Sequence, residues 1–266
     1  ETYRRMLTEN NRPIQPLHLD VNNEIPLGMG CGSSAAARLA AIALAVEFGG
    51  LGWGEEEILA TATFLEGHPD NVTACWLGGM TVSAVSPKKT EQQNAELNAG
   101  KNDPLPRVHV ARIEPPEHWR AVIVFPREPV RTEESRKVLP GHYSRADVVE
   151  NLQHCSLLVA AFASGNNELL QAAMSDRLHQ PYRSVICPLL LELQPMVAIP
   201  GVLGAALSGA GPGMLLIVER KLDPDVLDRL LMQALADSNG LEVVQCGFES
   251  LGAASSANLG VRLCPL

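Results

Sequence analysis

The spacing of hydrophobic residues predicts a chain that mixes helices and strands. Residues 1–12 carry hydrophobic side chains at helical spacing, and Pro13 ends that pattern. Leu17-His18-Leu19-Asp20-Val21 alternates between hydrophobic and polar side chains, which predicts a half-buried strand over residues 14–25. Because helices and strands follow no regular β-α-β period, the class expected is α+β. Further helices are expected at 33–48, 55–65, 133–138, 146–164, 167–178, 188–197 and 223–237, and further strands at 81–85, 108–113, 119–125, 214–218, 242–248 and 259–264.

A polar stretch at residues 86–107 interrupts this pattern. It is rich in Lys, Gln, Asn, Glu and Pro, which is typical of a solvated loop or insertion. The chain of 266 residues is long enough for one large domain or two small ones. We therefore expect a first domain at 1–107 and a second at 108–266.

Composition narrows the class of protein. Hydrophobic residues make up 46% of the chain and charged residues 19%, which indicates a globular protein. A net charge of −9 without a long basic run argues against nucleic acid, and no uninterrupted apolar stretch reaches membrane length. The opening residues do not read as a signal peptide, and the six cysteines form no C-x-x-C pair. Scattered cysteines of this kind predict reduced thiols and a cytoplasmic protein.

The most informative stretch is the glycine-rich segment before the alanine-rich helix, with Gly28, Gly30 and Gly32. Glycine allows positive φ and a close backbone approach to a ligand, and free N–H groups at a helix start bind anions. Ser33 and Ser34 can cap that helix or reach a phosphate or its metal ion. A phosphate chain is the expected ligand; the alternative is a glycine-rich turn with a serine cap and no ligand.

Two well-known phosphate loops do not fit. No Lys follows the glycines, so the G-x-x-x-x-G-K-[ST] pattern fails, and Ser33 stands where a dinucleotide fingerprint needs its third glycine. The segment instead resembles the loop P-x-G-x-G-L-G-S-S-A-A of the GHMP kinases, with Cys31 in place of the usual Leu. By this resemblance, the nucleotide-binding residues are Pro26, Leu27, Gly28, Met29, Gly30, Cys31, Gly32, Ser33, Ser34, Ala35 and Ala36.

A second cluster of polar residues follows the helix expected at 55–65. Taken alone, Glu66-Gly67-His68-Pro69-Asp70-Asn71 fits a solvated turn. It resembles the E-G-H-P-D-N motif of the homoserine kinases, which lie within the GHMP superfamily. The resemblance implies that Glu66 and Ser34 hold a Mg²⁺ ion on the β- and γ-phosphates, a donor set that suits Mg²⁺. It also implies that Asp70 and Asn71 face an amino acid substrate; Asp70 could orient or accept the proton, and the base is left open.

Two further motifs carry arginines. Residues 125–140 resemble the P-x-x-x-x-x-T-x-x-[AS]-R-x-[VI]-L-P pattern of that family, in which Thr132 and Arg136 match substrate-contacting positions. Residues 176–183 resemble D-x-x-x-x-P-Y-R, which ends in Arg183. A guanidinium binds a carboxylate through two parallel hydrogen bonds. By this resemblance, Arg136 and Arg183 together favour an amino acid substrate over a sugar or mevalonate; taken alone, the first motif fits an exposed helix.

The segment 208–213 resembles the third GHMP motif, S-G-[SA]-G-P-[TS]. By that resemblance Ser208, Gly209 and Gly211 lie beside the phosphate loop and the substrate. Gly213 replaces the usual Thr or Ser and removes a hydroxyl.

Together the motifs resemble a homoserine kinase from about residue 14 onward. The resemblance implies ATP-dependent phosphorylation of the L-homoserine side-chain hydroxyl, with ATP and Mg²⁺ and on the way to threonine. It also implies a nucleotide-binding α/β domain, a ferredoxin-like α+β domain and a homodimer. The alternatives are another small-molecule GHMP kinase and a non-catalytic nucleotide-binding member of the superfamily.

The family's N-terminal motif, P-A-[ST]-S-A-N-L-G-P-G-F-D, does not occur at the start of this sequence. We therefore expect that a segment precedes Glu1. Residues 253–260 spell most of that motif near the other end, which we interpret as coincidence in a final strand.

Overall fold

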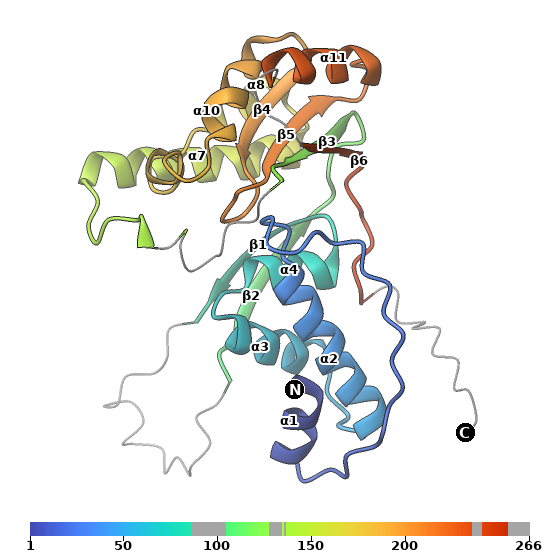
Figure 1. The fold of residues 1–266 in the computed structure, drawn as a ribbon. Coiled ribbons are helices and arrows are strands. Elements are labelled where there is room, and N and C mark those ends of the chain that lie inside the picture. The colour runs from blue at the N-terminus through green and yellow to red at the C-terminus, as the bar shows by residue number, and fades with distance from the viewer. Residues whose placement is uncertain (87–104, 128–134, 136, 236–240, 255–266) are drawn as a thin grey trace. The chain divides into compact units, whose positions relative to one another are not determined.

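The computed structural model describes residues 1–86, 105–127, 135, 137–235 and 241–254. These residues belong to two compact units (Figure 1). Unit 1 contains Glu1–Glu24, Ser34–Arg112 and the chain from Glu249, and unit 2 contains Ile25–Ser33 and Ile113–Phe248.

Unit 1 combines helices with a two-stranded sheet. Its elements are α1 (Thr2–Glu9), α2 (Ser33–Gly49), α3 (Glu55–Glu66), α4 (Asp70–Leu77), β1 (Met80–Val85) and β2 (Val108–Ile113). Alanine and leucine, which are strong helix formers, dominate α2. Three glutamates stabilise the first turn of α3, and Gly67 ends that helix in the left-handed conformation with φ 88°.

The core of unit 1 lies between these helices. Leu7 of α1, Leu39 and Ile42 of α2, Leu59 of α3 and Val72 of α4 are all buried in one cluster. Each such side chain contributes about 1.5–3 kcal/mol relative to exposure. This packing fixes the N-terminal turn of α2 relative to the C-terminal turn of α3.

Unit 2 is built on an antiparallel sheet with the strand order β4-β5-β3-β6. The strands and the helices between them run in the order β-α-β-β-α-β that defines a ferredoxin-like fold, so the expected fold class is confirmed. The elements are β3 (Trp119–Phe125), α7 (Arg145–Ser164), α8 (Asn167–Ala173), α9 (Gln180–Arg183), α10 (Leu189–Leu193), the 3-10 helix η1 (Gln194–Ala198), β4 (Val202–Leu207), β5 (Met214–Glu219), α11 (Pro224–Ala234) and β6 (Glu242–Cys246).

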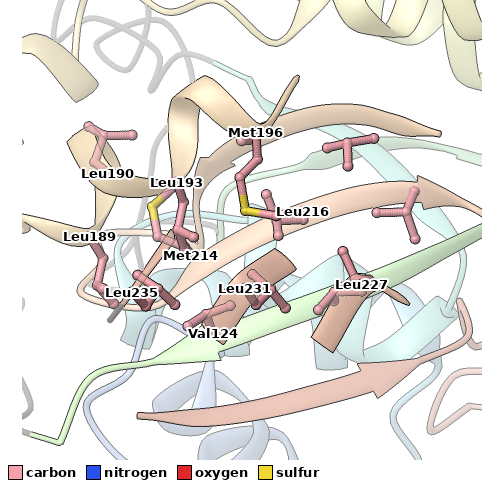
Figure 2. Packing of buried hydrophobic residues seen from close by; sticks show 14 residues of the cluster. Val124, Leu189, Leu190, Leu193, Met196, Met214, Leu216, Leu227, Leu231 and Leu235 are labelled. Atoms are coloured by element: carbon pink, nitrogen blue, oxygen red, sulfur yellow. The ribbon is translucent and has the colours of Figure 1, made fainter. Parts of the chain in front are cut away.

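One face of this sheet carries the core of unit 2. Figure 2 shows Val124 of β3 and Leu216 of β5 packed with Leu227 and Leu231 of α11 and with residues of α10. In the β3–β5 ladder Val122 pairs with Leu216 and Val124 with Met214, so even-numbered residues of both strands share this face.

Several expected elements differ from those observed. Residues 14–25 form no strand, and Leu19 and Val21 are 54% and 74% exposed. A strand needs a hydrogen-bonding neighbour, and no described strand pairs with this segment. The helix expected at 188–197 becomes α10 followed by η1, because Pro195 lacks the N–H that would continue an α-helix.

Three more differences concern length and position. The helix expected at 167–178 ends at Ala173, and α4 and β4 were not expected. The helix expected at 133–138, most of the loop 86–107 and the strand expected at 259–264 lie largely or wholly outside the described residues.

The domain boundary after residue 107 stays a prediction. β2 begins at Val108 and pairs with β1, so its first residues belong with unit 1, and the glycine-rich segment belongs with unit 2. Among the described helices, none combines the length and apolarity needed to cross a membrane.

Candidate active site

The glycine-rich segment packs against the loop 208–213 inside unit 2. Gly28, Gly30 and Gly32 have φ values of 71°, 82° and 69°, a region that disfavours other residues. The Ser208 hydroxyl donates to the Gly30 carbonyl at 3.1 Å. The two segments expected to lie side by side are therefore in direct contact, and the Ser208 hydroxyl is used to hold them together.

At three glycines of this contact there is no room for a side chain. A Cβ on Gly30 would collide with the Ser208 carbonyl, and a Cβ on Gly209 would lie 2.8 Å from the Gly30 carbonyl oxygen. A Cβ on Gly213 would lie 2.5 Å from the Met29 carbonyl oxygen and 3.2 Å from the Phe125 ring. The departure of Gly213 from the Thr or Ser of the family motif thus matches a tight backbone approach.

Cys31 lies half-buried in the same loop. Burial raises the pKa of its thiol above the ordinary value, and a hydrogen bond with Ser208 works in the opposite direction. The thiol is therefore protonated near neutral pH and behaves as a small, weakly polar side chain.

Arg183 reaches the same region from α9. Its side chain is buried, with the residue only 8% exposed. Its Nε donates to the Ser135 carbonyl at 3.3 Å, and its Nη1 donates to the Gly209 carbonyl at 3.4 Å. The Ser135 hydroxyl in turn donates to the Ala210 carbonyl at 2.6 Å. A guanidinium thus stands beside the 208–213 loop.

The segment 176–183 explains how Arg183 is positioned. The Asp176 carboxylate accepts hydrogen bonds from the backbone N–H groups of Leu178, His179 and Gln180, which fixes the turn that leads into α9. The Gln180 side chain accepts from the Leu207 N–H at 3.1 Å, which ties α9 to the end of β4. Burial and the nearby Arg183 charge lower the pKa of His179.

In unit 1, the start of α2 meets the end of α3. The Ser34 hydroxyl donates to Oε2 of Glu66 at 3.1 Å. Arg38, one turn further along α2, forms an ion pair with the same carboxylate and donates to the Leu65 carbonyl at 2.6 Å. The Glu66 side chain is only 11% exposed. The two residues expected to hold a metal are therefore adjacent, and Arg38 lies beside them.

Asp70 begins α4, just after Glu66. Its Oδ1 lies 2.5 Å from Nδ1 of His68 and accepts the Asn71 backbone N–H at 2.8 Å. The Asp70 side chain is 72% exposed. The contact holds the Asp70 carboxylate beside the His68 imidazole.

Ser34 and Glu66 fit a magnesium ion. Among the described residues, Ser34 and Arg38 both contact Oε2 of Glu66 and no hydrogen bond reaches Oε1. In the described part of the chain, no group of three or more His, Cys, Asp and Glu side chains is arranged so that it could hold a metal ion by itself. Mg²⁺ is commonly held by one or two carboxylates together with phosphate oxygens and water, and this donor set meets that requirement.

Sequence reasoning missed two residues of the site. Arg38 follows Ser34 by four residues, so both lie on one face of α2, which is a readable signal for a contact with Glu66. Ser135 stands at the [AS] position of the motif at 125–140, but the motif gave it no role, because its hydroxyl contacts a loop far along the chain. Thr132 and Arg136 lie outside the described residues.

Comparisons with known proteins agree with this geometry. Residues 1–79 match the family model of the GHMP kinases N terminal domain, and residues 158–231 match that of the GHMP kinases C terminal. A homoserine kinase from Solibacter usitatus is 43% identical over 207 residues, covering 78% of this chain and 62% of the relative. One from Deinococcus radiodurans is 35% identical over 230 residues, covering 86% of this chain and 69% of the relative.

Solved structures show the same fold. The crystal structure of homoserine kinase from Cytophaga hutchinsonii superposes with a TM-score of 0.69 at 23% identity, covering 86% of this chain and 69% of that one. The structure of a putative homoserine kinase from Listeria monocytogenes gives 0.69 at 23% identity, covering 94% and 79%.

The chain spans 62%, 69% and 63% of the length of three curated relatives that it matches. Both domain models of the family match in the expected order, and the two-unit fold agrees with them. The chain therefore belongs to the GHMP kinase family and, within it, to the homoserine kinases.

Proposed function

We propose that this protein transfers the γ-phosphate of ATP to the side-chain hydroxyl of L-homoserine, a step towards threonine. The observation that carries the proposal is the contact between the Ser34 hydroxyl and the Glu66 carboxylate, 3.1 Å apart at the start of α2. The relatives at 43% and 35% identity are homoserine kinases, which supports the choice of reaction and of acceptor.

The glycine-rich segment 26–32 would bind the phosphate chain of ATP. Its three glycines at positive φ bring backbone N–H groups close to a ligand, and α2 begins at Ser33 directly after them. Positioning and charge neutralisation account for most of the catalysis in phosphoryl transfer, so this chain needs no covalent nucleophile. Mg²⁺ held by Ser34 and Glu66 would neutralise the phosphate oxygens.

Arg183 and Asp70 are the proposed ligands of the amino acid. A guanidinium suits the α-carboxylate, and an aspartate suits the ammonium group. Asn71, Ser208, Gly209 and Gly211 complete the proposed substrate site, together with Thr132 and Arg136. Asp70, with His68 at 2.5 Å, is the group proposed to orient the attacking hydroxyl or accept its proton.

The proposal extends to the conditions of the reaction. Mg²⁺ is the proposed metal, and a homodimer is the proposed assembly on the strength of the family resemblance. The described cysteines include no disulfide, and their thiols suit the reducing cytoplasm that we propose as the compartment.

An acceptor panel tests this proposal. The purified chain is incubated with Mg-ATP and L-homoserine, L-serine, mevalonate or galactose, and ADP release is followed. We expect turnover with L-homoserine alone, and its loss in Arg183→Ala. Turnover with mevalonate or galactose would contradict the substrate assignment. ATP binding without turnover of any acceptor would indicate a non-catalytic nucleotide-binding protein.

A further inference from the structure

Two arginines share one face of the sheet in unit 2. In the β3–β5 ladder Arg120 pairs with Val218, on the face that also carries Val122 and Leu216. Arg220 lies two residues after Val218, and its backbone N–H donates to the His118 carbonyl at 2.7 Å, which continues the ladder by one residue. Because side chains alternate between faces, Arg120 and Arg220 lie diagonally opposite each other on the same face.

Neither guanidinium has an acidic partner in the described part of the chain. Arg120 donates from Nη2 to the Leu222 carbonyl at 2.5 Å, while its buried Nε has no hydrogen-bond partner there. Glu219 is the acid nearest to Arg220 in sequence, but it pairs with Lys221 at 3.1 Å and accepts from Asn167 at 2.7 Å. Glu219 pairs with Trp119 in the ladder and therefore belongs to the opposite face.

The two arginines line a pocket with the end of β6. Its volume is ≈ 260 Å³, and the lining residues are Arg120, Arg220, Gln245, Cys246 and Gly247. Gln245 pairs with Val122 in the β3–β6 ladder, so it belongs to the same face as Arg120. Its amide nitrogen donates to the carboxylate of Asp228 in α11 at 2.7 Å.

Physical chemistry favours an anion in this pocket. Two guanidiniums on neighbouring strands repel each other, and a bound anion relieves that repulsion. A pocket lined by two arginines without an acidic partner among the described residues is unusual in a chain whose net charge is −9. Two planar guanidinium groups that approach from different strands match the several oxygens of a tetrahedral anion better than the two oxygens of one carboxylate.

We propose that this pocket, at the end of the unit 2 sheet beside α11, binds a phosphate group. The group belongs either to free phosphate or to a small phosphorylated metabolite. Arg120 and Arg220 are the ligands of the phosphate group, and Gln245, fixed by its hydrogen bond to Asp228, forms part of the pocket wall. None of the five lining residues belongs to the segments assigned above to ATP or to homoserine, so the site does not depend on the proposed kinase reaction.

Calorimetry tests the site directly. Inorganic phosphate is titrated into the chain without nucleotide, at constant ionic strength set by NaCl, and glycerol 3-phosphate is titrated in a second arm. Arg220→Gln changes an exposed residue, so folding is retained; Arg120→Gln is checked by its thermal unfolding. The matched control is Arg229→Gln, an exposed arginine on α11 that does not line the pocket.

We expect Arg220→Gln and Arg120→Gln each to weaken phosphate binding at least about tenfold, because a charge-assisted hydrogen-bonding partner is lost. Arg229→Gln and the phosphate-loop variant Ser34→Ala should retain this binding event. Tighter binding of glycerol 3-phosphate than of phosphate would assign the pocket to a metabolite, and the reverse order to free phosphate. Unchanged binding in Arg220→Gln, or no binding of either probe by the unmodified chain, would overturn the proposal.

If Arg120→Gln fails to fold, nuclear magnetic resonance of the arginine Nε–H groups in the unmodified chain replaces it. The Arg120 Nε–H resonance should shift on addition of phosphate and should not shift on addition of the same concentration of chloride. An Arg120 Nε–H resonance that does not shift on addition of phosphate would contradict the assignment of Arg120 as a phosphate ligand.

Discussion

The guanidinium of Arg38 on α2 is ion-paired with the carboxylate of Glu66, the last residue of α3. A helix C-terminus carries partial negative charge and is an unfavourable place for a carboxylate. Arg38 offsets this cost, and it also donates to the last-turn carbonyl of Leu65 at 2.6 Å. The pair therefore holds the Glu66 side chain in place with Oε2 turned towards Ser34.

Replacing Arg38 should weaken the response to Mg²⁺. In Arg38→Gln we expect the concentration of free Mg²⁺ that gives half-maximal ADP release to rise about three- to tenfold. The reason is that a mobile Glu66 loses roughly 0.6–1.4 kcal/mol of preorganised binding. Arg38→Lys should recover part of the effect, and a direct titration of Mg²⁺ and nucleotide by calorimetry should show the same order.

The control for Arg38 is Arg5→Gln. Arg5 forms an exposed pair with Glu9 at 2.7 Å on α1, and such pairs contribute about 0–1 kcal/mol. Arg5→Gln should leave the Mg²⁺ dependence of ADP release unchanged. Equal Mg²⁺ dependence in Arg38→Gln and the unmodified chain would show that Arg38 serves folding alone.

Gly30→Ala should abolish nucleotide binding. Its Cβ would collide with the Ser208 carbonyl at a residue whose φ is 82°, so the loop must shift. We expect a loss of about 1–3 kcal/mol in stability and the loss of measurable ATP binding by calorimetry. Gly141→Ala is the control, because its Cβ meets no neighbouring atom within 4 Å. ATP binding by Gly30→Ala at the unmodified affinity would refute the assigned role of this loop.

Alkylation of Cys31 reports on the same loop. The pKa of this thiol lies above its ordinary value of 9.0 because of burial, so its thiolate fraction and its labelling by iodoacetamide should rise steeply above neutral pH. Mg-ATP should slow labelling of Cys31 several-fold. Cys155, exposed on α7, is the internal control and should react at the same rate with and without nucleotide. Peptide mass spectrometry measures the alkylation rates of Cys31 and Cys155 separately. A Cys31 alkylation rate that Mg-ATP does not change would show that the nucleotide does not bind at this loop.

His179 should make stability depend on pH. Burial and the Arg183 charge lower its pKa below 6.5 in the folded protein, so the unfolded chain binds the proton first as the pH falls. The contribution is complete above about pH 6.5 and is lost as the pH falls towards the folded pKa. Urea unfolding at about pH 7.5 and about pH 5.5 should show a larger loss of stability for the unmodified chain than for His179→Gln. Parallel losses in the two proteins would exclude His179 as the cause.

Local patterns in the sequence predicted much of the fold. The alanine-rich run of α2, the apolar runs of β3 and β5 and the amphipathic α11 each carry their own signal, and all appear close to the expected ranges. Within the segment 14–25, Leu17 to Val21 alternate between hydrophobic and polar side chains, yet the segment forms no strand, because pairing depends on a neighbour that the local pattern does not reveal. Pro195 could have divided the helix expected at 188–197.

In the candidate site, too, local motifs predicted some features, and contacts between distant parts of the sequence determined others. Ser34 and Glu66 belong to two separate motifs that the family resemblance paired, and their side chains lie 3.1 Å apart. The roles of Gly30 and Gly213 depend on carbonyls nearly 180 residues away in sequence, which composition and spacing do not contain. Arg120 and Arg220 become neighbours only through the register of the β3–β5 ladder.

Phosphorus nuclear magnetic resonance of the reaction mixture tests the central claim most directly. The chain is incubated with Mg-ATP and L-homoserine, and the phosphorus spectrum is followed over time, with Glu66→Gln in parallel. We predict the growth of a phosphomonoester resonance that matches O-phospho-L-homoserine, at a rate at least about 100-fold higher than in Glu66→Gln, as expected when a metal ligand of a phosphoryl-transfer site is lost. Release of inorganic phosphate alone, or equal rates in the two proteins, would contradict the proposed reaction and the role of Glu66.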